Sequence, residues 1–202
     1  MSQHNKHPEW DRFIEIMRSE IVPALGCTEP VAIAYAAAKA AELLGEPADR
    51  ILVSVSGNLL KNGMGVVVPG TGETGLDIAA AVGATGGVAG LGLEVLRDLT
   101  PEQVERGKSL CVEGKVQVKL AESVDLLYAE VTWYGAGHEV TAVIKHEHTN
   151  IVRIVKDGNE VFNKNDESKQ DSDGSACLSS MEAINDFAVN APLEMISFLL
   201  HP

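Results

Sequence analysis

The chain has 202 residues, of which 45% are hydrophobic and only 4% are aromatic. This length predicts one domain over residues 1–202, and its core should be built from Ala, Val, Leu and Ile. The formal net charge of −13 disfavours binding to nucleic-acid phosphates and to anionic membranes. Residues 1–8 are polar and no apolar run is long enough to span a bilayer, so a cytoplasmic location is expected.

The spacing of apolar residues predicts a mixture of helices and strands. Helices are expected at 9–22, 30–44, 76–82, 100–113, 180–190 and 193–200. Strands are expected at 51–56, 66–68, 115–120, 127–133, 139–144, 151–155 and 160–162, and the last four should form two hairpins. Residues 163–175 are polar and charged, which is typical of a surface loop. The expected fold class is α/β (α+β), with a mainly antiparallel sheet covered by helices.

The segment Ala24–Pro30 opens a buried, alanine-rich helix that should end near Gly45. Thr28 is the expected N-cap, and a glutamate followed by a proline suits a first helical turn. Cys27 then precedes a helix N-terminus, where unpaired N–H groups and the helix dipole stabilise a thiolate. A small buried residue is an equally weighted alternative, because cysteine is among the most buried residue types.

Residues 56–65 and 70–75 are rich in glycine and are expected to form two loops around the short strand at 66–68. They contain neither of the two glycine-rich nucleotide-binding motifs. Backbone N–H groups and a few polar side chains could instead hold a small carboxylate. The candidate groups are those of Ser56, Asn58, Lys61, Asn62, Gly63, Thr71 and Gly72. A pair of tight turns with a solvated lysine is the alternative interpretation.

His148 lies between two expected strands, in the sequence His148-Thr149-Asn150. A histidine there could act as an acid or a base, because its ordinary pKa is about 6.5. A half-exposed histidine at a strand end is the alternative. His146 lies close by, but two histidines without further ligands make a weak metal site, and no metal site is expected. The three cysteines are widely spaced and lack a C-x-x-C pair, which disfavours a disulfide framework.

Four motifs, taken together, resemble the L-cysteine desulfidase family, which is related to the iron–sulfur L-serine dehydratases. They are PALGCTEP at 23–30, SGNLLKNGMG at 56–65, VPGTG at 68–72 and HTN at 148–150. The resemblance covers nearly the whole chain and keeps the order and spacing of the motifs. Members of that family are roughly twice as long, so this chain resembles their first half only.

The resemblance implies β-elimination, in which L-cysteine gives sulfide and an aminoacrylate that hydrolyses to pyruvate and ammonia. It implies that Cys27 is the base for the substrate Cα proton, with Glu29 and His148 as the further catalytic residues. It implies substrate-binding roles for Thr28, Ser56, Asn58, Lys61, Asn62, Gly63, Thr71, Gly72 and Asn150.

The family's cofactor is a [4Fe-4S] cluster held by three cysteines of the second half, and pyridoxal phosphate is not implied. Cys111 and Cys177 do not match those positions, so this chain alone is expected to bind no cluster and to turn over no cysteine. The expected partners are L-cysteine or L-serine, a cluster-carrying second domain or chain, and a second copy of this chain. Two alternatives stay open: an L-serine dehydratase-like ammonia-lyase domain, and a non-catalytic module that binds a small amino acid.

Overall fold

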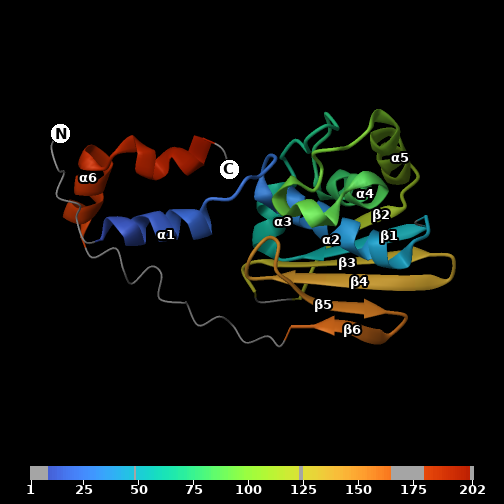
Figure 1. Ribbon diagram of the computed structural model, residues 1–202. Coiled ribbons are helices and arrows are strands. Elements are labelled where there is room, and N and C mark those ends of the chain that lie inside the picture. Colours follow the sequence, from blue (N-terminus) through green and yellow to red (C-terminus); the bar gives the residue numbers. More distant parts are fainter. Residues whose placement is uncertain (1–8, 48, 123–124, 165–179, 201–202) are drawn as a thin grey trace. The chain divides into compact units, whose positions relative to one another are not determined.

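The structure is a computed structural model that describes residues 9–47, 49–122, 125–164 and 180–200 (Figure 1). Most of the loop expected at 163–175 lies outside these residues. Contacts divide the chain into two compact units, one of Ala24–Asp166 and one of Met1–Pro23 together with Glu167–Pro202. The single domain expected over residues 1–202 stays a prediction.

The larger unit contains one six-stranded sheet. Its strands are β1 (Arg50–Val55), β2 (Val116–Leu120), β3 (Tyr128–Gly135), β4 (His138–Lys145), β5 (Ile151–Lys156) and β6 (Asn159–Asn163). Their order in the sheet is β2-β1-β3-β4-β5-β6. Only β1 and β2 pair in parallel, and all other neighbours are antiparallel. The predicted fold class, α/β with a mainly antiparallel sheet covered by helices, is confirmed.

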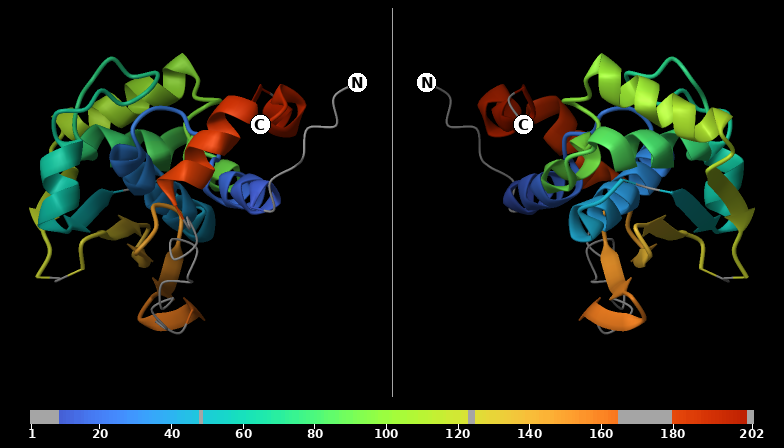
Figure 2. Two further views of the ribbon diagram at one scale, coloured as in Figure 1. Left: turned by 90° about the vertical axis from the view of Figure 1, so that its left-hand side faces the viewer. Right: turned by 90° about the vertical axis from the view of Figure 1, so that its right-hand side faces the viewer.

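The helices of this unit gather on one face of the sheet (Figures 1 and 2). They are α2 (Thr28–Leu44), α3 (Gly57–Gly63), α4 (Leu76–Gly86), the 3-10 segment η1 (Ala89–Glu94) and α5 (Pro101–Val112). Helix α2 packs on β3, β4 and α4, and α4 packs in turn on α5. Helix α2 is therefore enclosed between the sheet and other helices, which explains its apolar, alanine-rich sequence.

Small residues allow α2 and α4 to approach each other closely. Five alanines of α2 between positions 32 and 38 have no solvent exposure at all. A Cβ atom added at Gly83 of α4 would lie only 2.6 Å from the Cα atom of Ala34. The position of α2 thus depends on the absence of a side chain at residue 83.

The ends of α2 agree only in part with the sequence prediction. Gly45 follows the helix with a positive φ of 76°, as expected for a glycine that ends a helix. The N-cap is Cys27 and not Thr28, which is already the first helical residue. The prediction of Thr28 as the cap is wrong because the extended backbone (φ −74°, ψ 135°) occurs at Cys27.

The prediction of a loop over 56–65 is wrong in its centre, because residues 57–63 form helix α3. Ser56 caps this helix: its Oγ accepts a hydrogen bond from the backbone N–H of Leu59 at 3.4 Å. Leu59 is buried in the main core, so packing overcomes the low helix propensity of the glycines and asparagines. The strand expected at 66–68 is reduced to a single bridge between Val67 and Thr74.

The smaller unit is helical in its described part. It contains α1 (Trp10–Glu20), α6 (Met181–Asn190) and the 3-10 segment η3 (Leu193–Leu200). Its core is aromatic: the ring of Phe187 packs edge-on against the rings of Trp10 and Phe13, with centroids 6.0 and 5.4 Å away. The indole N–H of Trp10 donates to Asp186 at 3.2 Å. Within the described residues, no helix combines the length and apolarity that a membrane crossing requires.

Replacing Gly83 by alanine should destabilise the larger unit by about 1–3 kcal/mol, because the new methyl group overlaps the backbone of α2. Urea unfolding of the Gly83→Ala variant measures this loss. Gly90→Ala is the matched control, since a Cβ at Gly90 would meet nothing within 4 Å. Equal stability of the two variants would contradict the close packing of α2 on α4.

Candidate functional site

Cys27 and Glu29 form a hydrogen-bonded pair at the start of α2. The thiol of Cys27 donates to Glu29 Oε2 at 2.8 Å, and Thr28 Oγ1 lies 3.4 Å from the same oxygen as a second donor. From the last turn of α3, the side-chain amide of Asn62 donates to Glu29 Oε1 at 3.2 Å. Donors from two helices therefore hold the Glu29 carboxylate in place.

The turn before Cys27 is fixed by its neighbours. Gly26 has a positive φ of 83°, and a Cβ atom there would lie 2.7 Å from Cγ of Pro69. The backbone N–H of Leu25 donates to the carbonyl of Leu93 at 3.1 Å. Glycine is therefore required at position 26, and Pro69 and η1 brace the residues that lead into the site. Sequence reasoning did not assign a role to Pro69.

The Cys27 thiol is half-buried, and its pKa is raised above the ordinary value. Burial raises the pKa most, and the hydrogen bond to the Glu29 carboxylate and its negative charge raise it further. The backbone N–H groups of Thr28 and Glu29 act in the opposite direction, as expected at a helix start. Their lowering effect on the pKa is smaller than the combined raising effect of burial and the carboxylate. The stabilisation of a thiolate that its place before the helix predicts is therefore outweighed in this state of the site, and the thiol keeps its proton.

Glu29 and His148 influence each other's pKa, and the pKa of each side chain is lowered. The pKa of Glu29 is lowered, chiefly by the Cys27 hydrogen bond and also by Asn62 and by the charge of His148. The pKa of His148 is lowered by burial, while the nearby Glu29 charge opposes this change. At neutral pH the site thus holds a protonated thiol, an ionised carboxylate and a neutral imidazole, which can accept a proton.

Three of the sequence candidates have structural roles. Ser56 is buried, caps α3 and donates its hydroxyl to the carbonyl of Leu126 at 2.9 Å. Thr71 is buried and donates its hydroxyl to the carbonyl of Val68 at 2.8 Å. Gly63 is buried beneath the side chain of Leu76. Their predicted contact with substrate stays a prediction.

The other candidates lie on the surface or near it. Helix α3 carries three of them on its exposed surface, Asn58, Lys61 and Asn62. Gly72 is exposed at a turn with a positive φ of 72°. Asn150 is half-buried. Its side-chain amide donates to the carbonyl of Lys145 at 2.9 Å, and its carbonyl oxygen accepts from Lys164 at 2.7 Å. These two bonds tie the turn that carries His148 to β4 and to the end of β6.

The described residues do not fit an iron–sulfur cluster, which requires several cysteine thiolates. Among them, no three His, Cys, Asp or Glu side chains gather in a way that could hold a metal ion. Burial, with added repulsion from Asp77 and Glu73, raises the pKa of Cys111 to about 11, which disfavours its thiolate. Cys177 lies outside the described residues.

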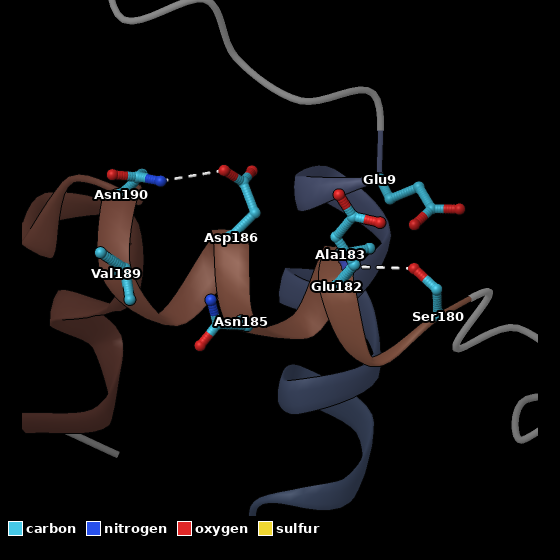
Figure 3. A pocket seen from close by; sticks show the side chains of 8 residues that line it. All are labelled: Glu9, Ser180, Glu182, Ala183, Asn185, Asp186, Val189 and Asn190. Atoms are coloured by element: carbon cyan, nitrogen blue, oxygen red, sulfur yellow. Dashed lines mark hydrogen bonds between the residues drawn. The ribbon is translucent and has the colours of Figure 1, made fainter.

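A separate pocket of about 700 Å³ lies in the smaller unit, along α6 (Figure 3). Its lining is mostly acids and amides, among them Glu182, Asn185 and Asp186. Asn190 donates to Asp186 at 2.9 Å across this surface. None of the residues predicted from the sequence as catalytic or substrate-binding lines it.

Fold and site together define an α/β protein with a thiol–carboxylate pair at the start of a buried helix. The chain is similar to proteins named UPF0597 protein. It is 56% identical over 195 residues to one from Oleidesulfovibrio alaskensis, covering 96% of this chain and 45% of that protein. It is 47% identical to one from Aeromonas hydrophila and 42% identical to one from Bacteroides fragilis, covering 95% of this chain in both cases and 44% and 45% of those proteins.

The chain thus spans less than half the length of these curated relatives. No family model matches the sequence, and no solved structure matches it. The relatives' names state no reaction, and none of the three is that of a cysteine desulfidase. The finer resemblance therefore stays a proposal.

Replacing Glu29 by glutamine should lower the pKa of Cys27, because the negative charge that repels the thiolate is removed while the helix N–H groups remain. The pH dependence of alkylation by iodoacetamide measures this shift, in a background with Cys111 and Cys177 replaced by alanine. Glu42→Gln on the same helix is the control and should leave the alkylation midpoint unchanged. A midpoint that stays constant or rises in Glu29→Gln would contradict the assigned pair.

Proposed function

We propose that this chain is the substrate-binding and proton-abstracting part of a lyase that eliminates sulfide from L-cysteine. The observation that carries the proposal is the hydrogen bond between the Cys27 thiol and the Glu29 carboxylate, with His148 close enough to sense the charge of Glu29. The resemblance of the four sequence motifs to the L-cysteine desulfidase family supports the choice of reaction.

The elimination breaks two bonds of the substrate. The Cα–H electrons form the Cα=Cβ double bond, the proton goes to a base, and sulfur leaves Cβ with the electron pair of the C–S bond. Glu29 Oε2 already accepts the thiol hydrogen of Cys27, so movement of that proton to Glu29 leaves a thiolate that can take the Cα proton. The aminoacrylate then hydrolyses to pyruvate and ammonia.

The surface of α3 is suited to the substrate carboxylate. Asn58 precedes Lys61 by three residues and Asn62 by four on one helix, so it shares a face with both. Asn62 of this face donates to Glu29, so the face lies beside the Cys27–Glu29 pair. Lys61 is exposed and has no ion-pair partner within the described residues. Its ammonium is available to the substrate carboxylate.

Departure of sulfide needs an electrophile that receives the developing charge. We assign this role to the part of the longer relatives that this chain does not cover, since the described residues form no metal site. The chain alone is therefore expected to bind the amino acid without turning it over.

The experiment uses a fusion of residues 1–202 with the segment of the Oleidesulfovibrio alaskensis relative that the chain leaves uncovered. The fusion should release sulfide and pyruvate from L-cysteine. Cys27→Ala should lower kcat by about 100-fold or more, as expected for loss of a general base. The control Cys111→Ala should keep its activity.

Each other outcome contradicts part of the proposal. A higher kcat/KM for L-serine than for L-cysteine would make the protein an L-serine dehydratase-like ammonia-lyase. Binding of the amino acid without turnover, unaffected by Cys27→Ala, would make it a binding module.

A further inference from the structure

The face of the sheet opposite the helices carries a row of polar and charged side chains. On β3, Ala129, Val131 and Trp133 belong to the core under the helices. The alternating residues, including Tyr128, therefore point to the other face. The strand register extends this face: Tyr128 lies opposite Lys145, and Val143, two residues before Lys145, lies opposite Arg153.

A pocket of about 310 Å³ is formed on this face by β3, β4, β5 and the end of β6. Its lining contains three cationic side chains from three segments of the chain, Lys145, Arg153 and Lys164, and no carboxylate. The remaining lining residues are Tyr128, Val143, Val152 and Asn163. The chain has 29 acidic and only 16 basic residues. Three cations around one pocket are therefore unusual for this chain and indicate an anionic ligand.

The three cations differ in their neighbours: Lys164 contacts a neutral amide, whereas Lys145 lies near a carboxylate. Lys164 donates to Asn150 Oδ1 at 2.7 Å, which fixes its position while leaving its charge uncompensated. Arg153 is exposed and forms no hydrogen bond or ion pair within the described residues. On the far side Lys145 lies 3.6 Å from Asp125. The local positive charge is therefore strongest between Arg153 and Lys164.

Tyr128 lines the pocket and contacts the neighbouring acid Glu130. Its hydroxyl donates to Glu130 at 2.9 Å, so the Glu130 carboxylate is bound to a neutral donor. Burial and this contact raise the pKa of Tyr128, which keeps the phenol protonated. The lining therefore combines guanidinium and ammonium donors with the apolar side chains of Val143 and Val152, a common composition for small-molecule sites.

We propose that this pocket binds a small anion with two or three negative charges, held between Arg153 and Lys164. Guanidinium and ammonium groups bind phosphoryl and carboxylate oxygens through charge-assisted hydrogen bonds. The volume of about 310 Å³ is at the lower end for ligand pockets and fits a small phosphorylated or polycarboxylate metabolite. The site shares no lining residue with the Cys27–Glu29 pair, so the inference does not depend on the proposed elimination.

The test titrates the 202-residue chain at low ionic strength with inorganic phosphate, pyrophosphate and citrate, and follows backbone amide NMR signals. We expect saturable shifts at Tyr128, Lys145 and Arg153, with pyrophosphate or citrate binding more tightly than phosphate. If pyrophosphate binds best the natural ligand is a phosphoryl compound, and if citrate binds best it is a polycarboxylate. Arg153→Gln and Lys164→Gln should each weaken binding roughly tenfold or more.

Arg97→Gln and Lys39→Gln are the matched controls, because neither side chain lines this pocket and both pair with local acids. They should bind the anions as the unchanged chain does. Shifts that never saturate with any of the three anions would overturn the proposal. Equal weakening by the control and pocket variants would overturn it as well, since that result describes general charge attraction.

Discussion

The tight burial of helix α2 is the constraint on which the rest of the structure depends. Its alanines allow α4 to approach so closely that a Cβ atom at Gly83 would overlap the backbone of Ala34. On its other side the helix lies on β3 and β4. A helix held this way cannot shift its first turn without disturbing the core, because protein interiors are packed like crystals. The geometry of Cys27 and Glu29 thus depends on packing along the whole of α2 as well as on their nearer contacts with Asn62 and Pro69.

The chemistry of the site comes from two opposing influences on one sulfur atom. The start of α2 offers N–H groups that favour a thiolate, as helix N-termini do for many reactive cysteines. Glu29 offers a negative charge two residues later and favours the thiol. Because the carboxylate and burial prevail, the proton stays on the sulfur in the resting site and is hydrogen-bonded to Glu29. In the proposed elimination, this proton moves to Glu29 and leaves the thiolate that takes the Cα proton.

Much of the fold could be predicted from the sequence, since its signals are local. Apolar spacing predicts α2, the hairpin of β3 and β4, and the end of α2 at Gly45. Helix α3 could not be predicted in this way, because its asparagines and glycines have low helix propensity and its stability comes from buried Leu59.

The resemblance to a family groups Cys27, Glu29 and His148, and their catalytic roles stay a prediction. In the structure Cys27 donates to Glu29, and Glu29 and His148 lie close enough to influence each other's pKa. The direction of the Cys27 pKa was wrong, since a sequence cannot weigh a helix dipole against a carboxylate two residues away. The basic pocket had no sequence signal, because Lys145, Arg153 and Lys164 meet only through the strand register.

The central claim is that the Cys27 thiol is protonated at neutral pH and donates a hydrogen bond to the Glu29 carboxylate. Infrared spectroscopy of the S–H stretching band tests it directly, in a chain where Cys111 and Cys177 are replaced by alanine. The account predicts an S–H band at neutral pH, at a frequency lowered by hydrogen bonding, that moves to higher frequency in Glu29→Ala. The absence of any S–H band at neutral pH, or a band that Glu29→Ala leaves in place, would contradict it.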